Sequence, residues 1–417
     1  MSEKFYGLLG RTLGHSYSPE IHALLGNPDY RLFPREPEEL AGLVQSEDLG
    51  GLNVTIPYKK DVIPFCDSIS DNVREIGAAN TLVRRNGTLM AFNTDMTGFL
   101  SMVQSAGIEA AGQKCLVLGS GGASLAVKAA LKHLGAADII TISRGGPDNY
   151  ENLDRHADAG ILVNTTPVGM FPNCPASPVS LDGFPALQGV LDVVYNPSLT
   201  GLLLEAEERG IPGAGGLVML VAQAIAAHEL FFGLRDDDRK PVDALKAAEL
   251  THKLRCNAEN IILCGMPGSG KSSVAYALSD MTGRPVIDTD EQIVEMAGKT
   301  IPEIFAEDGE ERFRKLETKV IELAGKQSGN ILSLGGGAVL YKRNYPLLHQ
   351  NGRIYRLLRP LELLAMDGRP LSKDLPTLRR MASEREPYYD FFSDMDVDNT
   401  GTVEETAEKI FLDFTRL

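Results

Sequence analysis

The sequence lacks the features that mark membrane proteins, low-complexity proteins and repeat proteins. Its 417 residues contain no apolar run long enough to span a bilayer, no low-complexity tract and no clear internal repeat. The first residues, MSEKFYGLLG, lack the long apolar core of a signal peptide. A membrane role is therefore not expected, and the composition, 43% hydrophobic and 23% charged, is typical of a soluble globular protein.

Cysteine is scarce, and its positions exclude a cysteine-based metal site. The five cysteines are scattered without metal-type spacing, at Cys66, Cys115, Cys174, Cys256 and Cys264. We therefore expect reduced thiols and a cytoplasmic location.

Positive charge is also in deficit. The chain has 41 Lys and Arg against 56 Asp and Glu, a formal net charge of −15, and no local basic patch. A protein of this charge is repelled by a phosphate backbone, so we expect no nucleic-acid partner.

Strand-like and helical patterns alternate through most of the chain. The length suggests about three folding units at roughly 150 residues per domain. A segment dense in charge, residues 234–260, divides the chain: KCLVLG, DIITIS, GILVNTT and GVLDVVY precede it, and NIILCG, RPVIDTD, NILSLGGG and GRIYRLL follow it. This alternation predicts parallel sheets with helices on their faces, the α/β class, in both halves.

A complete phosphate-binding loop stands at the start of the second half. In CGMPGSGKSS, Gly265, Gly270, Lys271 and Ser272 match G-x-x-x-x-G-K-[ST] between the apolar run IILC and the helical pattern SSVAYALSD. In such a loop backbone N–H groups surround the phosphates, the lysine reaches the β and γ oxygens, and the hydroxyl ligates Mg²⁺. The loop predicts ATP and Mg²⁺ but does not name the acceptor.

Two acidic residues follow the next strand-like run. Asp288 and Asp290 in VIDTDE alternate at a strand end and so point to the same side, where one can hold Mg²⁺ through water and the other can meet an acceptor hydroxyl. Further on come IPEIFAEDGEERFRKLE, LGGGAV, DGRPLS and REPYYD. With these motifs, residues 258–417 resemble shikimate kinase.

That resemblance implies roles for particular residues. Asp290 would bind the ring hydroxyls of shikimate and orient the attacking one, and Asp288 would assist the metal. Arg314 and Arg385 would hold the substrate carboxylate, which planar guanidinium groups suit. Arg369, in the lid motif R-P-L, would close over the transferring phosphoryl group. The other implied contacts are Gly336 and Gly337 to the substrate, and Gly265, Gly268, Gly270, Lys271, Ser272 and Ser273 to ATP.

The lid departs from the family pattern. The segment LLAMDGRPLSKD is shorter than the usual lid and lacks the arginine that commonly stacks on adenine ahead of R-P-L. We expect this departure to affect ATP affinity and lid closure.

A second glycine-rich turn, VLGSGGAS, lies in the first half. Gly119, Gly121 and Gly122 follow the strand-like KCLVL and precede a helical pattern, the place for a pyrophosphate at a helix N-terminus, although Ser124 replaces the third fingerprint glycine. The next strand-like run ends in ISRG, where Arg144 suits a 2′-phosphate and hence NADP. A solvated surface arginine is the open alternative.

Several other stretches of the first half carry a resemblance of their own. These are GHSYSPEIH, GLNVTIPYKK, GAANTL, NTDMTG, NTTPVGM, DVVYNPSLTGLL and GGLVMLVAQAIAAHELFFG. At this spacing residues 5–233 resemble shikimate dehydrogenase. The resemblance implies that Lys59 and Asp95 are the catalytic pair, and a lysine beside a carboxylate can protonate the alkoxide that hydride reduction of a ketone creates.

The same resemblance implies the binding residues. The implied substrate contacts are Ser16, Ser18, Asn53, Thr55, Asn80, Tyr195 and Gln223. The implied NADP contacts are Gly119, Gly121, Gly122, Ala123, Arg144, Asn164, Thr165, Val168 and Met219.

Together the two resemblances imply a bifunctional enzyme. It would reduce 3-dehydroshikimate to shikimate with NADPH and then phosphorylate shikimate with ATP and Mg²⁺. The expected architecture is α/β throughout: a discontinuous α/β substrate domain (1–98 and 213–234), a Rossmann-type NADP-binding domain (99–212), a flexible linker (235–257) and a P-loop, NMP-kinase-like parallel α/β domain (258–417).

Two alternatives stay open at this point. The dehydrogenase half could prefer quinate and NAD, or the chain could be a regulatory protein that senses quinate or shikimate. Retention of Lys59, Asp95, Lys271 and Asp290 argues against the sensor, as does the lack of a recognisable DNA-binding element. The expected partners are small-molecule substrates only.

Overall fold

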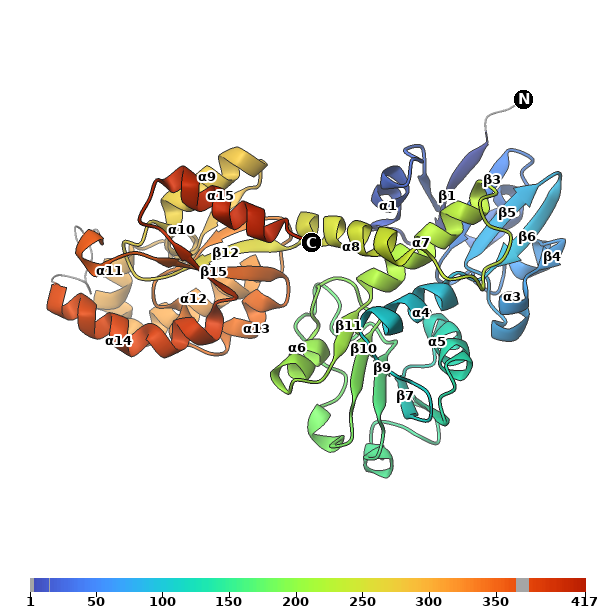
Figure 1. Cartoon of the computed structure of the whole chain (residues 1–417), viewed down its shortest axis with the longest axis horizontal. Coiled ribbons are helices and arrows are strands. Elements are labelled where there is room, and N and C mark those ends of the chain that lie inside the picture. Colours follow the sequence, from blue (N-terminus) through green and yellow to red (C-terminus); the bar gives the residue numbers. More distant parts are fainter. Residues whose placement is uncertain (1–3, 15, 365–374) are drawn as a thin grey trace. The chain divides into compact units, whose positions relative to one another are not determined.

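The strands of the chain form three separate sheets in the residues that the structure describes. The structure is a computed structural model, and it describes residues 4–14, 16–364 and 375–417 (Figure 1). Arg369 of the expected lid lies outside the described residues. No helix within the described ranges is long and apolar enough to cross a membrane.

The chain divides into two compact units. The N-terminal unit comprises residues 1–170, 176–195 and 202–251, and the C-terminal unit comprises residues 171–175, 196–201 and 252–417. The first two sheets belong to the N-terminal unit, and the third belongs to the C-terminal unit.

The first sheet is mixed and six-stranded, in the order β2-β1-β3-β5-β6-β4. Its strands are β1 (Phe5–Gly10), β2 (Arg31–Pro34), β3 (Leu49–Val54), β4 (Ser68–Ile69), β5 (Thr81–Arg85) and β6 (Thr88–Phe92). The antiparallel hairpin of β5 and β6 turns at Asn86 and Gly87, whose φ angles of 51° and 82° are those that a two-residue hairpin turn requires. The short helices of this region are α1 (Ser18–Leu24), α2 (Leu40–Val44) and α3 (Asp71–Ile76).

Two longer helices join segments that are far apart in the sequence. Helices α4 (Asp95–Ser105) and α7 (Leu217–Phe231) pack together at Gly98, where a Cβ atom would lie 2.5 Å from the carbonyl oxygen of Met219. The far end of α7 packs on the first sheet, because the ring of Phe231 fills the space beside Gly51 where a side chain would otherwise stand. The substrate-binding part is therefore discontinuous in sequence, as the fold class predicted from the sequence requires.

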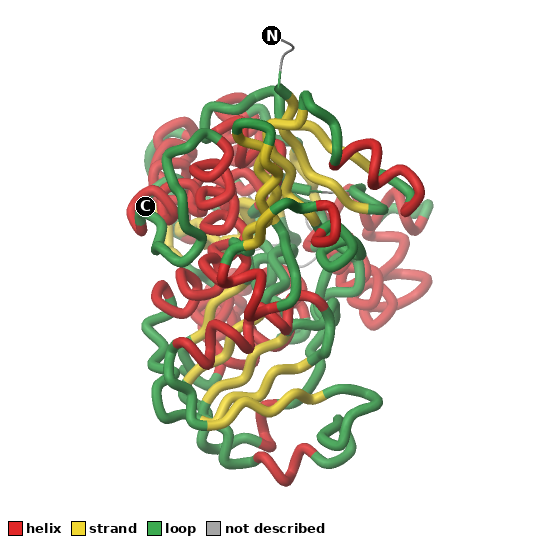
Figure 2. Tube along the Cα trace, turned by 90° about the vertical axis from the view of Figure 1, so that its right-hand side faces the viewer, coloured by secondary structure: helices red, strands yellow, loops and turns green. Residues whose placement is uncertain are grey.

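The second sheet is parallel throughout, in the order β11-β10-β9-β7-β8. Its strands are β7 (Lys114–Leu118), β8 (Asp138–Ile142), β9 (Ile161–Asn164), β10 (Gly189–Asp192) and β11 (Gly213–Gly215), which run side by side in the lower part of Figure 2. Its helices are α5 (Gly122–His133) and α6 (Gly201–Glu208). The chain passes from β7 to β8 on one side and then to β9 on the other, so a ligand crevice is expected where β7 and β9 end.

The third sheet is also parallel, in the order β13-β14-β12-β15-β16. Its strands are β12 (Asn260–Cys264), β13 (Val286–Asp288), β14 (Ile331–Ser333), β15 (Gly352–Leu358) and β16 (Met395–Asp398). Its helices are α9 (Lys271–Thr282), α10 (Thr289–Ala297), α11 (Ile301–Glu303), α12 (Gly309–Gly325), α13 (Asn344–His349), α14 (Leu375–Phe392) and α15 (Val403–Phe414). Alternate residues of β12 enter different cores: Ile261 and Leu263 pack with α9 and α15, whereas Ile262 and Cys264 pack with α12 and α13. Because both faces are covered, NIILC reads as an unbroken apolar run.

The segment 235–257, predicted as a flexible linker, has defined structure instead. Asp238 is 1% exposed, and one of its carboxylate oxygens accepts hydrogen bonds from the Ser70 hydroxyl at 2.6 Å and the Asn93 N–H at 2.7 Å. The chain then forms helix α8 (Ala244–Ala258). The prediction of a flexible coil is wrong because it rested on local charge, whereas the partners of Asp238 lie far upstream in the sequence.

We expect the substitution Asp238→Ala to destabilise the N-terminal unit by about 2 kcal/mol, because it leaves the buried Asn93 N–H without an acceptor. Asp238→Asn keeps an oxygen that can accept the hydrogen bonds of Ser70 and Asn93, so it is expected to lose less stability than Asp238→Ala. The measurement is the urea midpoint for hydrogen exchange in the peptide that contains Asn93. Asp236→Ala changes an exposed carboxylate of the same segment and is the matched control. Equal midpoints for Asp238→Ala and the control would show that Asp238 is not an anchor.

Candidate active sites

Lys59 and Asp95 form an ion pair in the N-terminal unit. Lys59 lies in the turn after β3, where its carbonyl accepts a hydrogen bond from the Ala79 N–H at 2.7 Å, and Asp95 is the first residue of α4. The Lys59 Nζ is 2.5 Å from the Asp95 Oδ2, and the two side chains are 17% and 11% exposed. An ammonium held in this way can donate a proton to a substrate oxygen placed beside it.

A network of amide side chains orients this pair. The Asn80 Nδ2 donates to the Asp95 Oδ1 at 2.9 Å and to the Thr94 Oγ1 at 3.0 Å. Gln223, on α7, brings its Oε1 to 3.4 Å from the Asn80 Nδ2. Asn80 is 3% exposed, so Asp95 is held in place by a buried side chain. Gln223 and Asn80 were predicted to contact substrate hydroxyls; the structure places Asn80 against Asp95 and Gln223 against Asn80.

Asn53 belongs to the same network from its other side. Its Nδ2 lies 3.2 Å from the Thr81 Oγ1, while its Oδ1 accepts from the Tyr30 hydroxyl at 2.8 Å and lies 3.2 Å from the His22 Nε2. Burial, reinforced by repulsion from His228, lowers the pKa of His22 to about 3, so its ring is neutral. Sequence reasoning did not identify Tyr30 as a partner of Asn53, because nothing in the local pattern links a tyrosine in the loop before β2 to a residue of β3.

The remaining predicted substrate residues lie near the start of α1 and the end of β3. The Ser18 N–H donates to the Ser16 Oγ at 3.2 Å, which orders the turn before α1. The ring centroid of Tyr195 lies 5.6 Å from that of Tyr17, and Tyr17 stands between the two serines in the sequence. Thr55 follows β3 directly, with its methyl group against Gly10. Ser16, Ser18 and Tyr195 are therefore brought to one region.

The first glycine turn has the space that a pyrophosphate needs. Gly119 has a φ of 101°, and a Cβ atom there would lie 2.9 Å from the Thr166 side chain. A Cβ atom at Gly121 would meet nothing within 4 Å, and one at Gly122 would meet only the Lys59 side chain, at 4.0 Å. Helix α5 begins at Gly122 and carries Ala123 in its first turn, so its free N–H groups face this space. The turn predicted to hold the dinucleotide therefore lies beside Lys59.

The loop after β9 forms the next wall. Asn164 is fully buried and uses its side chain within the loop: its Oδ1 accepts from the Thr166 N–H at 3.0 Å, and its Nδ2 donates to Asp192 at 3.0 Å. The Thr165 hydroxyl donates to the Leu118 carbonyl at 2.7 Å, which ties β9 to β7. Val168 is an exposed apolar residue of the same loop, 39% exposed. Asn164 and Thr165 thus use their side chains for hydrogen bonds within the protein, and Met219 is a buried apolar residue of α7.

Arg144 follows β8 and is exposed. No ion-pair partner for it appears among the described residues. The carboxyl end of β8 adjoins that of β7, which leads into the glycine turn. A solvent-exposed guanidinium in this position can meet a phosphate on the ribose of a dinucleotide.

The second glycine loop, between β12 and α9, has the backbone of a phosphate cradle. Gly265, Gly268 and Gly270 have φ angles of 139°, 84° and 93°, a region that side chains disfavour. The Lys271 Nζ donates to the carbonyls of Gly265 at 3.0 Å and Met266 at 3.2 Å. The ammonium is thus held at the loop and available to phosphate oxygens.

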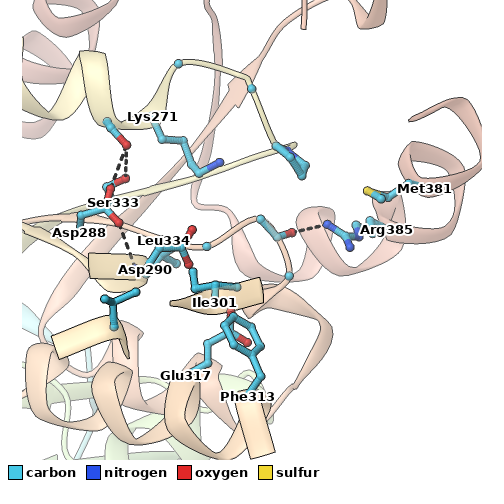
Figure 3. A pocket seen from close by; sticks show the side chains of 18 of the residues that line it. Lys271, Asp288, Asp290, Ile301, Phe313, Glu317, Ser333, Leu334, Met381 and Arg385 are labelled. Atoms are coloured by element: carbon cyan, nitrogen blue, oxygen red, sulfur yellow. Dashed lines mark hydrogen bonds between the residues drawn. The ribbon is translucent and has the colours of Figure 1, made fainter. Parts of the chain in front are cut away.

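This loop opens into a cavity of about 740 Å³, seen from close by in Figure 3. The predicted residues that line it are Gly268, Gly270, Lys271, Ser272, Ser273, Asp288, Asp290, Arg314, Gly336, Gly337 and Arg385. They come from separate segments of the C-terminal unit, so the fold gathers the kinase residues that the sequence predicted, apart from Gly265 at the base of the loop and the undescribed Arg369.

Oxygen atoms of Ser272 and Asp288 meet at the mouth of the loop. The Ser272 hydroxyl donates to the Asp288 Oδ2 at 2.9 Å, and the Asp288 Oδ1 caps α10 by accepting from the Asp290 N–H at 3.0 Å. The described residues contain no group of three His, Cys, Asp or Glu that could hold a metal. A hydroxyl with one carboxylate fits Mg²⁺ that takes its other ligands from phosphates and water.

Arg314 and Glu317 form a buried pair that sequence reasoning found only in part. The Arg314 Nη1 donates to the Glu317 Oε2 at 2.8 Å, and the two side chains are 4% and 1% exposed. Burial raises the pKa of Glu317 to about 7, although Arg314 opposes the shift, and Asp290 adds to it. Glu317 lines the cavity but was missed; its position three residues after Arg314 on one helix was the available signal.

Arg385 and the glycine loop after β14 complete the cavity wall. The Arg385 Nη1 donates to the Gly336 carbonyl at 2.7 Å, and the Tyr389 hydroxyl donates to the same oxygen at 2.9 Å. A Cβ atom at Gly337 would lie 2.5 Å from the Arg314 Nη1, so glycine is required for this approach. Both guanidinium groups therefore border one glycine loop.

Comparison with known proteins agrees with this division of the chain. Residues 8–82 match the family model of the shikimate dehydrogenase substrate binding domain, and residues 267–415 match that of shikimate kinase. Shikimate dehydrogenase (NADP(+)) of Caldicellulosiruptor bescii is 36% identical over 259 residues, which cover 54% of this chain and 88% of that protein.

Solved structures resemble the N-terminal part. A chorismate mutase/shikimate 5-dehydrogenase fusion protein from Clostridium acetobutylicum is 34% identical, with a TM-score of 0.56, and the match covers 61% of this chain and 98% of that one. Shikimate 5-dehydrogenase from Thermus thermophilus, in complex with NADP(H) and shikimate, is 30% identical, with a TM-score of 0.51 and coverage of 60% and 99%. The chain therefore belongs to the shikimate dehydrogenase family in its N-terminal part and carries a shikimate kinase domain in its C-terminal part.

Proposed function

We propose that the chain is a bifunctional enzyme of the shikimate route to aromatic amino acids. Its N-terminal part reduces 3-dehydroshikimate to shikimate with NADPH, and its C-terminal part phosphorylates shikimate with ATP and Mg²⁺. The observation that carries this proposal is that each unit brings predicted reactive residues together beside its own phosphate-binding turn. Lys59 and Asp95 adjoin Gly122, and Lys271 opens onto the cavity with Asp290, Arg314 and Arg385.

In the first reaction the bound NADPH supplies a hydride to the ketone carbon. The Lys59 Nζ holds the proton that the resulting alkoxide oxygen takes up. Asp95 keeps this ammonium in position, and Asn80 in turn fixes Asp95 through the bond to its Oδ1. We assign carboxylate binding to Ser16, Ser18 and Tyr195, which lie together near the start of α1.

In the second reaction ATP supplies the phosphoryl group, and the protein contributes position and positive charge. We assign the shikimate carboxylate to Arg314 and Arg385, whose guanidinium groups border the same glycine loop. Asp290 receives the attacking hydroxyl, and Lys271 neutralises charge on the transferred group. Ser272 and Asp288 are the residues that would hold Mg²⁺.

The alternatives considered from sequence are not favoured. The similar shikimate dehydrogenase of Caldicellulosiruptor bescii is named for NADP(+), and that of Thermus thermophilus is in complex with NADP(H). The chain also has the Lys59–Asp95 pair and the cavity with Lys271 and Asp290, which a sensor without turnover does not need. We propose a cytoplasmic location because the five cysteines are free thiols. We propose no nucleic-acid partner because the net charge is −15.

We expect Lys59→Ala to lower the dehydrogenase rate by at least about a hundredfold, the low end for loss of a general acid, and to leave the kinase rate unchanged. The measurement is NADPH oxidation with 3-dehydroshikimate, followed by ADP release on addition of ATP. Lys60→Ala alters an exposed neighbour of the same type and should retain both rates.

The reciprocal substitution tests the kinase. Lys271→Ala should abolish ADP release while NADPH oxidation continues, because Lys271 lies in the phosphate loop of the C-terminal unit only. Loss of both activities in a folded Lys59→Ala or Lys271→Ala protein would contradict two separate sites.

We also expect Arg144→Ala to raise the KM for NADPH about tenfold, since a charge-assisted bond to the 2′-phosphate is lost, and to change the KM for NADH little. Steady-state kinetics with both nucleotides measure this. Arg155→Ala removes another exposed arginine of the same β8–β9 connection and serves as the control. Wild-type enzyme that used NADH as well as NADPH would refute the assignment of Arg144.

A further inference from the structure

Arg359 is a cation of the ATP cavity that none of the assignments above uses. It follows β15 directly, is half-buried, and lines the cavity of the phosphate loop. Its Nε is buried and has no hydrogen-bond acceptor among the described residues. No described carboxylate forms an ion pair with Arg359. By contrast, Arg356, which lies within β15, pairs with Glu386 at 2.5 Å. A buried N–H without an acceptor lowers the stability of the fold unless a bound ligand accepts its hydrogen bond or otherwise contacts the guanidinium.

The Arg359 guanidinium lies beside Gly270, the last residue of the phosphate loop before α9. A Cβ atom at Gly270 would be 3.8 Å from the Arg359 Nη1 and 2.9 Å from the Asn399 Nδ2. Asn399 follows β16, which pairs with β15, and its Nδ2 donates to the Ser269 carbonyl at 2.6 Å. Arg359 therefore stands at the ends of β15 and β16, whereas the metal-binding oxygens of Ser272 and Asp288 stand at the end of β13. Arg359 thus approaches the phosphate loop from the side of β15 and β16, and Ser272 and Asp288 approach it from the side of β13.

The cavity offers few other flat surfaces for a purine. Among the described lining residues, the aromatic ones are Phe305 and Phe313, whose rings pack together with centroids 4.7 Å apart. Phe313 also lies under Arg314, with the guanidinium carbon 5.1 Å from its ring centroid, so both rings belong to the shikimate side. From Pro360 to Gly368 the sequence, PLELLAMDG, contains no arginine, lysine or aromatic residue.

From these observations we infer that Arg359 binds the adenine base of ATP by stacking its guanidinium plane on the purine. The inference rests on the proposed kinase function and adds a base-binding residue to it. A guanidinium is planar and weakly hydrated, so it stacks on an aromatic face, which an ammonium cannot do. Leu363, which lines the same cavity, adds an apolar edge near this place.

The test compares nucleotide binding with binding of phosphate alone. Calorimetric titration of the full chain with ADP is expected to show about tenfold weaker binding for Arg359→Ala than for wild type, which corresponds to ~1.4 kcal/mol. Inorganic triphosphate, which has no base, should bind both proteins equally. Arg359→Lys should behave like Arg359→Ala, because it keeps the charge but loses the plane. Arg380→Ala, which removes an arginine whose side chain is 74% exposed, is the matched control.

Three outcomes would overturn the inference. Unchanged ADP binding by Arg359→Ala shows that the residue does not contact the nucleotide. Restoration by Arg359→Lys, or an equal loss for inorganic triphosphate, shows a contact to phosphate rather than to base. Hydrogen-exchange protection of β12 (Asn260–Cys264), which lies in the core of the C-terminal unit, reports that each variant is folded. If wild type itself bound neither ADP nor triphosphate, the proposed kinase function would fail, which is distinguishable from failure at Arg359.

Discussion

Parallel strands place all their carboxyl ends at one edge of a sheet, and both phosphate-binding turns of this chain depend on that constraint. In the second sheet, β7 leads into the turn at Gly119 and β9 supplies the wall at Thr165. In the third sheet, β12 leads into the loop at Gly265, and β13 carries Asp288. Because each sheet is covered on both faces, its edge is the place where polar groups from distant segments can meet without being buried unpaired. The two phosphate-binding turns are therefore held by the ends of rigid strands.

The Lys59–Asp95 pair shows how this rigidity reaches the chemistry. Asp95 begins α4, where the free N–H groups of the first turn stabilise its negative charge. Its second oxygen is held by Asn80, so the carboxylate has a fixed direction from which to hold Lys59. Substrate hydroxyls bound beside such a network meet groups whose positions are already determined. The cost of ordering them is met in folding rather than in the reaction.

Local pattern was sufficient for the strands, the glycine turns and the family motifs, and it failed where partners are distant or act through a third group. The alternation of apolar runs gave the α/β class because a buried parallel strand is apolar on both faces. The segment 235–257 was predicted as a flexible linker because its charged residues resemble a solvated connector, and only the folded chain brings Ser70 to Asp238. Asn80 was predicted to contact substrate, yet its side chain also orients Asp95. Glu317 was missed because its burial depends on the packing of α12, which its local sequence does not specify.

The two proposed sites bind the carboxylate of shikimate with different chemistry. The first uses the neutral hydroxyls of Ser16 and Ser18, and the second uses the guanidinium groups of Arg314 and Arg385. A hydroxyl offers a carboxylate one donor, whereas a guanidinium offers parallel N–H donors and a positive charge, so the proposed contacts of the second site bring positive charge to the carboxylate and those of the first do not. Arg314, however, already forms a buried ion pair with Glu317, so part of its positive charge is balanced within the protein. A carboxylate bound at the proposed site would therefore share Arg314 with Glu317, whose Oε2 already accepts from the Arg314 Nη1 at 2.8 Å.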